Sequence, residues 1–259
     1  MYNVDGGYLT YKLSFGDYDA WQYKYGKDVS IFAMDNKSKR KEVYPEYKSQ
    51  RSLDTSKDEQ FKIVSELRKR IMSEKVMPIC SIEGLEADDI VACWSLFNPN
   101  EKIIGVDKDF FQLPHVETVL YHNLSCYHLI DTIGKLPQYV QKLACHNFAL
   151  YQILLGDVAD NIPRLLAKGR EGKEQIEDVL KTNDLCSYLL KTFKEDNVLR
   201  NAKLVLFPYF GRIDITDWFT AWCDDNYYRK AFWKGLYQQI NDCKLSNNVA
   251  ENSVYDLFS

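Results

Sequence analysis

The amino-acid sequence predicts an α/β fold: a mainly parallel sheet with helices on both faces, followed by a helical C-terminal region. Two observations carry this prediction. Short apolar runs alternate with helical patterns over the first 135 residues or so, and after that point strand signals fade while helical periodicity continues. Strand alternating with helix favours parallel strands that are buried on both faces.

Five apolar runs, most of them bounded by Gly, Asp or Asn, predict buried strands. They are residues 2–4, 29–34, 77–82, 102–106 and 118–121. Helical patterns with apolar residues three or four apart cover residues 61–71, 87–94, 139–155, 176–193 and the aromatic-rich 218–240. A further apolar run at residues 203–207 predicts an isolated strand. We expect domains at 1–150 and 151–243, with a tail at 244–259.

Composition limits the classes of protein that the chain can form. With 46% hydrophobic, 14% aromatic and 27% charged residues, its 259 residues suit a globular core and exclude disordered, collagen and coiled-coil classes. The seven cysteines are odd in number and lack zinc or redox spacing, which indicates reduced thiols in a cytosolic compartment. No apolar run approaches the roughly 20 residues of a membrane span, and no targeting segment is evident.

Acidic residues recur where a parallel sheet would place them at one edge. Asp5 and Asp35 close the first two predicted strands, and Asp107 follows the fourth. Carboxyl ends of parallel strands meet at one edge, which is where such sheets bind ligands. The full set of candidate carboxylates is Asp5, Asp35, Glu86, Asp88, Asp89, Asp107, Asp109, Asp157 and Asp160.

Such a set of carboxylates favours a divalent metal site. Clustered like charges repel one another, and bound cations relieve that repulsion. Oxygen ligands without His or Cys select Mg²⁺ or Mn²⁺ over zinc, and two such ions about 4 Å apart are suited to hydrolysing phosphodiesters. For any one residue the alternative is a helix cap or a turn, and Asp89 in particular could be only a cap.

Residues 37–51 form a basic segment, KSKRKEVYPEYKSQR, with six basic residues against two acidic ones. Without the nine candidate ligands, the chain has 28 acidic and 33 basic residues, although its formal net charge is −4. A positive remainder suits a phosphate backbone, and Tyr44 and Tyr47 could stack on bases. The alternative for this segment is a solvated loop.

Five sequence blocks, in this order, resemble the 5′ nuclease family of flap endonucleases and 5′ to 3′ exonucleases. The blocks are VDGGYLTYK, MDNKSKRKEVYPEYKSQR, LEADDIVA, VDKDFFQLP and LLGDVADNIP. The family includes the N-terminal domain of bacterial DNA polymerase I and phage ribonuclease H. The resemblance implies a PIN-like nuclease domain with a helical arch at about residues 36–65 and a helical region that holds duplex DNA.

The resemblance also implies a role for each matching residue. A first metal ion is held by Asp5, Asp35, Glu86, Asp88 and Asp107, and a second by Asp109, Asp157 and Asp160, while Asp89 acts mostly through bound water. Lys48 and Arg51 match arch residues that contact the scissile phosphate, and Arg40 matches a backbone contact. Tyr11 falls where members place a ring that stacks on the terminal base; its alternative is a core aromatic.

Two features depart from the family pattern. Only 30 residues separate Asp5 from Asp35, so the sheet there must be trimmed. The usual Gly-rich helix-hairpin-helix is replaced by RLLAKGREGKEQIEDVL, which makes a potassium site doubtful. A remodelled hairpin could still bind phosphate through Lys168, Gly169, Arg170, Gly172 and Lys173.

The last residues, SVYDLFS, resemble peptides that dock into the groove of a sliding clamp. The alternatives are a frayed tail and a segment folded back on its own domain.

The predicted function is a Mg²⁺-dependent 5′ nuclease, monomeric and with no membrane partner, in the cytoplasm of a phage-infected bacterium. It would remove 5′ flaps or RNA primers and degrade DNA and RNA–DNA hybrids from 5′ ends. Two alternatives stay open: a PIN-like nuclease for single-stranded RNA, and a non-enzymatic DNA-binding replication factor with a vestigial site.

Overall fold

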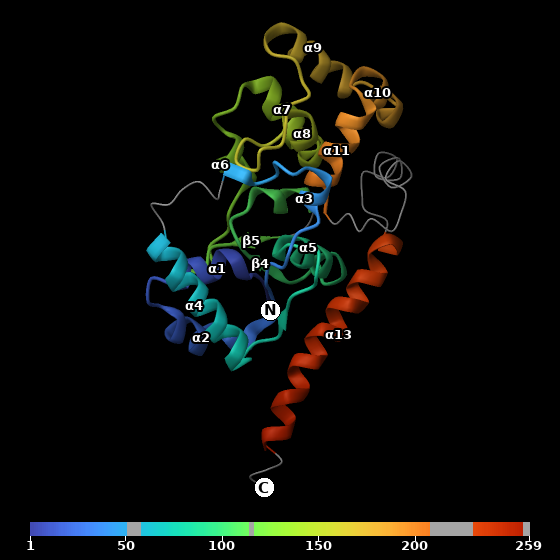
Figure 1. The fold of residues 1–259 in the computed structure, drawn as a ribbon. Coiled ribbons are helices and arrows are strands. Elements are labelled where there is room, and N and C mark those ends of the chain that lie inside the picture. Colours follow the sequence, from blue (N-terminus) through green and yellow to red (C-terminus); the bar gives the residue numbers. More distant parts are fainter. Residues whose placement is uncertain (51–57, 114–116, 208–229, 256–259) are drawn as a thin grey trace. The chain divides into compact units, whose positions relative to one another are not determined.

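The computed structural model describes residues 1–50, 58–113, 117–207 and 230–255 (Figure 1). The chain divides into two compact units, each described here by itself. The sheet unit comprises Met1–Ser38, Thr55–Tyr127 and Trp233–Ser259, and the helical unit comprises Lys39–Asp54 and His128–Phe232. The domain boundaries expected from the sequence stay a prediction.

The sheet unit is built on five parallel strands in the order β3-β2-β1-β4-β5. These are β1 (Tyr2–Asp5), β2 (Val29–Ala33), β3 (Ile79–Cys80), β4 (Lys102–Ile104) and β5 (Thr118–Val119). All five predicted strands are confirmed, as is the parallel α/β fold. Strand order reverses between β1 and β4, because β2 and β3 extend the sheet on one side of β1 and β4 and β5 on the other.

The strands are connected by helices, and one more helix packs beside them. These helices are α1 (Gly6–Leu13), α2 (Tyr18–Tyr25), η1 (Gly26–Asp28), α4 (Asp58–Glu74), α5 (Ala87–Phe97), η4 (Lys108–Gln112) and α13 (Lys230–Tyr255). The short connection between Asp5 and Asp35 therefore contains two helices and one 3₁₀ turn, with no strand before β2. The trimmed sheet expected there is confirmed.

Both faces of the sheet are covered. Successive residues of a strand point to opposite faces. On one face the Asn3 amide donates to the Ser95 hydroxyl of α5 at 3.0 Å. On the other face Val4 joins a buried cluster with Leu9 of α1 and Trp21 of α2. The near-continuous apolar character of the strands follows from this double burial.

Helix α13 belongs to the sheet unit through its N-terminal half. Trp233, Leu236 and Ile240 are buried at helical spacing, and the Cys93 thiol of α5 lies 3.8 Å from the Trp233 carbonyl oxygen. The helix extends to Tyr255, so the part of the expected tail between residues 244 and 255 is helical. Residues 256–259 lie outside the described residues, and clamp docking stays a prediction.

Among its described residues, the helical unit contains seven short helices. They are α3 (Arg40–Val43), α6 (Leu129–Ile133), α7 (Gln138–His146), α8 (Phe148–Leu155), α9 (Gly169–Val179), α10 (Leu185–Thr192) and α11 (Glu195–Val205). Asn147 caps α8 and Asp184 caps α10, each by accepting a backbone N–H at 3.0 Å. The helical structure predicted for residues 139–155 and 176–193 is confirmed. The first stretch is interrupted at Asn147, between α7 and α8, and the second at residues 180–184, between α9 and α10.

The strand predicted at residues 203–207 is wrong. Most of this run lies in α11, where Val198, Ala202 and Val205 are buried at helical spacing. A short apolar run does not distinguish a strand from a buried helix end, and here the acidic first turn with Glu195 and Asp196 starts a helix.

Within the described residues, none of the helices combines the length and the apolar character that crossing a bilayer requires. No disulfide joins the cysteines among these residues, which are Cys80, Cys93, Cys126, Cys145, Cys186 and Cys243.

Gly6 determines how closely α1 can approach the sheet. A Cβ atom at Gly6 would lie 2.2 Å from the Ala33 carbonyl oxygen, whereas one at Gly235 in α13 would meet nothing within 4 Å. We expect Gly6→Ala to lower the free energy of unfolding by about 1–3 kcal/mol. Gly235→Ala should leave it unchanged or raise it by up to about 1 kcal/mol. Urea unfolding of both variants and the parent checks this, and equal midpoints would contradict it.

Candidate functional site

The sheet unit carries a group of carboxylates at the carboxyl ends of its strands. Asp5 ends β1, and Asp107 lies three residues beyond the end of β4, so the two flank the point where strand order reverses. A Cβ atom built at Gly105 would lie 3.4 Å from the Asp5 Cβ, which shows how close these two strand ends are. Open parallel sheets bind ligands at such a reversal.

Asp5 is the N-cap of α1, and its carboxylate accepts the Tyr8 N–H at 3.1 Å. Burial raises the pKa of the Asp5 carboxyl from 3.8 to about 7, and the nearby Asp35 and Asp107 carboxylates add to the rise. The Tyr8 amide opposes the rise, because it stabilises the charged form. Asp5 is therefore a strand-end carboxyl whose negative charge is unfavourable without a nearby cation.

Asp35 lies two residues beyond β2 and faces the same place. Its Oδ1 accepts the Ala87 N–H at 2.9 Å, at the start of α5, and its backbone carbonyl accepts a hydrogen bond from Arg68 of α4. A Cβ atom at Gly7 would lie 3.1 Å from Asp35 Oδ2 and 3.3 Å from Asp5 Oδ1. Gly7 therefore leaves open a space between two carboxylates.

The start of α5 supplies three more acidic side chains. Glu86 and Asp89 are 7% and 3% exposed, and the Asp89 carboxylate accepts the Glu86 N–H at 3.1 Å. The Asp88 Oδ1 accepts the Asp89 N–H at 2.8 Å. Asp89 thus makes the capping interaction that the sequence offered as its alternative role.

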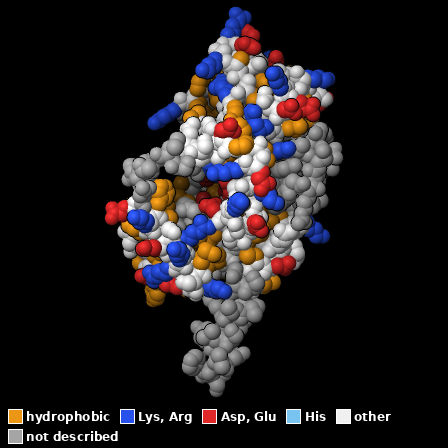
Figure 2. Space-filling model, viewed as in Figure 1, with side chains coloured by type: hydrophobic (Ala, Val, Ile, Leu, Met, Phe, Trp, Pro, Cys, Tyr) orange, Lys and Arg blue, Asp and Glu red, His pale blue; other side chains and the backbone are white. Residues whose placement is uncertain are grey.

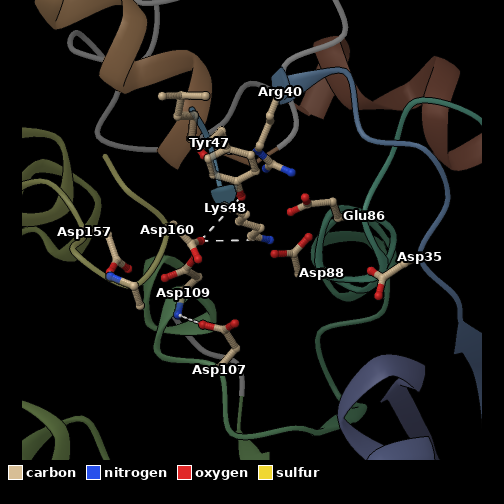
Figure 3. A network of polar contacts seen from close by, with 12 residues as sticks. Asp35, Arg40, Tyr47, Lys48, Glu86, Asp88, Asp107, Asp109, Asp157 and Asp160 are labelled. Carbon is tan, nitrogen blue, oxygen red and sulfur yellow. Dashed lines mark hydrogen bonds and ion pairs between the residues drawn. The ribbon is translucent and has the colours of Figure 1, made fainter. Parts of the chain in front are cut away.

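Asp88, Asp107 and Asp109 lie close enough to share one cation. Each offers a carboxylate oxygen, and these oxygens lie within 4.8 Å of one another. Asp107 Oδ1 also accepts the Asp109 N–H at 2.9 Å, so the turn of η4 brings both carboxylates to the same side (Figure 3). Hard oxygen donors at this spacing fit Mg²⁺ or Mn²⁺.

The helical unit carries Asp157 and Asp160 in a closed loop after α8. Asp157 and Ile162 exchange backbone hydrogen bonds of 3.0 and 2.7 Å. The loop begins at Gly156, whose φ is +67° and where a Cβ atom would lie 2.3 Å from the Ile162 carbonyl oxygen. Buried Asn201 of α11 donates to the Ile153 and Pro163 carbonyls at 2.9 and 2.7 Å and so holds both ends of this loop.

Lys48 is fixed beside Asp160. Its ammonium lies 3.9 Å from Asp160 Oδ2 and 4.9 Å from the Tyr47 ring centroid, while the Tyr47 hydroxyl donates to the same oxygen at 3.5 Å (Figure 3). The Lys48 N–H donates to the Asp160 carbonyl at 3.0 Å, with the Lys48 backbone at a φ of +55°. Tyr47 is buried, so its ring is not exposed for the base stacking that the sequence suggested.

Comparison with known proteins gives consistent results. The sequence model described as 5'-3' exonuclease, N-terminal resolvase-like domain, matches residues 20–139. A 5'-3' exonuclease of Aquifex aeolicus is 29% identical over 151 residues, which are 54% of this chain and 48% of that protein. DNA polymerase I of Borreliella burgdorferi is 29% identical over 154 residues, 56% of this chain and 16% of that protein. This chain thus spans about half the length of the first relative and a small part of the second.

Residues 20–139 are therefore similar to the N-terminal domain of 5'-3' exonucleases, and the two sequence relatives agree with that similarity. A structure of the bacteriophage T5 flap endonuclease with DNA and metal ions has the same fold, with a TM-score of 0.59 at 18% identity over 94% of this chain and 98% of that one. A structure of the T5 5′-exonuclease with zinc gives a TM-score of 0.58 at 19% identity, over 94% of this chain and 99% of that one. At 18–19% identity, these structural similarities establish the fold alone.

Seven of the nine predicted carboxylates lie in the sheet unit. They are Asp5, Asp35, Glu86, Asp88, Asp89, Asp107 and Asp109. Asp157 and Asp160 belong to the helical unit, so the convergence of all nine on one edge stays a prediction.

The predicted DNA contacts differ in accessibility. Arg40 is 8% exposed and its Nε donates to the Leu204 carbonyl at 3.0 Å, a position typical of a structural arginine. Tyr11 is 39% exposed, so the alternative of a core aromatic is wrong for it. Arg51 lies outside the described residues. For Arg40, Tyr11 and Arg51 alike, contact with DNA stays a prediction.

The altered hairpin is formed by α8 and α9. Gly169, with a φ of +70°, begins α9 after Lys168, and a Cβ atom at Gly172 would lie 2.1 Å from the Ala167 carbonyl oxygen. Arg170 pairs with Glu174 at 2.7 Å, and Lys173 pairs with Glu177 at 3.8 Å. The glycines therefore serve a tight turn, and phosphate binding by this turn stays a prediction.

The sequence interpretation missed the parts that Gly7 and Arg68 play. Arg68 holds the backbone next to a candidate ligand, but it stands in a helical pattern that predicts only packing. Gly7 could have been noticed, because two adjacent glycines directly after a strand-end Asp suggest a close approach of chain segments.

The raised Asp5 pKa gives a testable pH dependence in EDTA. The folded protein holds the Asp5 proton more tightly than the unfolded chain, in which the pKa of this carboxyl is 3.8. Protonated Asp5 therefore contributes its full stabilisation of the folded state below pH 3.8. It is lost as pH rises to about 7. Between pH 3.8 and about 7, we expect the melting temperature of the parent to fall more than that of Asp5→Asn.

Adding Mg²⁺ at pH 8 should restore more stability to the parent than to Asp5→Asn, because a cation compensates for the charge. Parallel pH profiles for the two proteins would contradict the assignment.

Proposed function

We propose that this protein is a divalent-metal-dependent 5′ nuclease that hydrolyses phosphodiester bonds of DNA or RNA–DNA at 5′ ends and flaps. The observation that carries the proposal is the group of Asp88, Asp107 and Asp109 oxygens within 4.8 Å of one another beside the strand reversal. The similarity of residues 20–139 to the N-terminal domain of 5'-3' exonucleases supports the reaction type. Removal of RNA primers during phage replication, in the infected host cytoplasm, belongs to the proposal.

Asp5, Asp35, Glu86, Asp88 and Asp107 are proposed to hold a first Mg²⁺ or Mn²⁺ ion. Asp109, Asp157 and Asp160 are proposed for a second, as the family resemblance implies, and Asp89 supports α5 beside them. When bound, the two ions would lower the pKa of the attacking water and stabilise the charge on the leaving oxygen. In-line attack would leave a 5′-phosphate and a 3′-hydroxyl.

The chain's own residues orient these ligands. Backbone N–H groups at the start of α1, α5 and η4 bind Asp5, Asp35 and Asp107, which fixes the direction of each carboxylate before a cation arrives. Ligands that are held in this way lose little freedom on binding a metal. The space beside Gly7 between Asp5 and Asp35 gives access to their oxygens.

Lys48 is proposed to bind the scissile phosphate and to offset its developing charge, together with Arg51. Asp160 keeps the ammonium in a defined place. On the face seen in Figure 2, the described Lys and Arg side chains are interspersed with acidic side chains and form no broad basic patch. We therefore assign the backbone contacts to individual cations that are held in position, as Lys48 is.

The direct test is cleavage of a duplex with a labelled 5′ single-stranded flap, in Mg²⁺ and in EDTA, with sizing of the products. Metal-dependent cutting near the flap junction, or stepwise from the 5′ end, supports the proposal. Tight binding without cutting would favour the non-enzymatic replication factor. Faster cutting of unstructured RNA than of the flap would favour the single-stranded ribonuclease.

Asp107→Asn should reduce the cleavage rate in Mg²⁺ by about 100-fold or more, because it removes one of the charges that hold the cation. Asp157→Asn should also slow cleavage. Asp28→Asn is the matched control, since exposed Asp28 precedes β2 at the opposite edge of the sheet and should cleave like the parent. The mechanism fails if Asp107→Asn or Asp157→Asn keeps the parental rate.

Lys48→Met should weaken flap binding and reduce the salt dependence of the binding constant by about one phosphate contact. Stabilisation by Mg²⁺, measured as a melting shift, should stay at the parental value. Lys48→Arg retains the charge, and Lys27→Met removes an exposed lysine from η1; both should bind nearly as the parent does. An unchanged salt dependence in Lys48→Met would remove Lys48 from the interface.

A further inference from the structure

Helix α1 and the turn after it carry aromatic rings along one side, at intervals of three or four residues. Tyr8, Tyr11 and Phe15 follow one another at this spacing, and such residues are neighbours on a helix surface. The Tyr11 and Phe15 ring centroids lie 5.6 Å apart with perpendicular planes. The Lys12 ammonium lies 5.9 Å from both the Tyr8 and the Tyr11 ring centroids. A positive charge is therefore placed among the rings.

This row begins at the carboxylates. Gly7 of α1 faces Asp5 and Asp35, and Tyr11 lies four residues further on, hence on the same face of the helix. One helical turn rises about 5.4 Å, so Tyr11 is about one turn from the acidic group. Phe15 extends the row by a second interval, just beyond the end of α1.

The outer two rings are exposed although their backbone is held in place. Tyr11 is 39% and Phe15 is 64% exposed. Between them, the Ser14 hydroxyl donates to the Tyr11 carbonyl at 2.7 Å and accepts from the Gln60 amide of α4 at 2.6 Å. Figure 1 shows α1 and α4 side by side. The rings are therefore positioned at the surface by hydrogen bonds, without being buried in the core.

We propose that Phe15 and Lys12 continue from Tyr11 as a stacking platform for unpaired bases of the nucleic acid strand whose phosphate enters the carboxylate group. The inference rests on the proposed nuclease function and deepens it. Exposed rings bind the flat faces of bases without regard to sequence, and a lysine between rings pairs with the connecting phosphate. The charge of Lys12 favours this occupant over a purely apolar protein segment.

Binding of single-stranded DNA in EDTA tests the platform without cleavage. Fluorescence anisotropy would compare a thymidine oligonucleotide with an abasic strand of equal length, for the parent, Phe15→Ala and Phe15→Trp. Phe15→Ala should bind the base-bearing strand about 10-fold more weakly and the abasic strand as the parent does. Phe15→Trp should restore affinity, and its fluorescence should change on binding.

Tyr23→Ala is the matched control, because Tyr23 is an aromatic residue of α2 that is 92% exposed. It should bind both strands as the parent does. Lys12→Met should weaken binding of both strands, since it removes a phosphate contact and leaves the rings.

Equal binding of the base-bearing strand by Phe15→Ala and the parent would overturn the inference, as would an equal loss on the abasic strand. Flap cleavage by the parent, measured separately in Mg²⁺, tells this failure from failure of the proposed function. If the parent cleaves while Phe15→Ala binds normally, only the platform is wrong. If Phe15→Ala loses base-dependent binding and the parent does not cleave, the platform stands and the nuclease does not.

Discussion

Repulsion between carboxylates at one edge of the sheet is the constraint on which the rest of the sheet unit depends. Asp5, Asp35 and Asp107 lie at or just beyond the ends of three different strands. The charge of Asp5 is disfavoured mainly by burial, and the Asp35 and Asp107 carboxylates add to this effect. Each of the three accepts a backbone N–H at the start of a helix or 3₁₀ turn. Because the partly positive N-terminus of a helix stabilises negative charge, the helices that follow the strands make the acidic edge tolerable.

The sequence predicts the sheet well because each strand is a short apolar run with a distinct boundary. It predicts the acidic edge for a related reason, because residues that directly follow parallel strands all lie at the same edge of the sheet. Residues 203–207 show the limit, because an apolar run at the end of a helix has the same composition as a buried strand. The family resemblance does not remove that ambiguity, since its sequence blocks end before this region.

The roles of single side chains were less accessible to sequence interpretation. Arg40 and Lys48 stand in the same basic segment, but one is buried against the Leu204 carbonyl and the other is held by Asp160. Only the tertiary fold separates these two environments, because both partners lie more than 100 residues away along the chain. Charge patterning predicts that such a segment is basic, but not which of its cations is placed for a ligand.

The two units stabilise their acidic groups by different means. In the helical unit, the Lys48 ammonium and the Tyr47 hydroxyl both lie beside Asp160 Oδ2, and the Asn201 amide holds the loop that bears this carboxylate. In the sheet unit, Asp5 has the backbone amides of Tyr8 and Gly7 as favourable partners and keeps a pKa of about 7. An amide dipole offsets less charge than an ammonium does, so near neutral pH a cation that binds beside Asp5 must displace a proton. Asp5 therefore couples metal binding to pH.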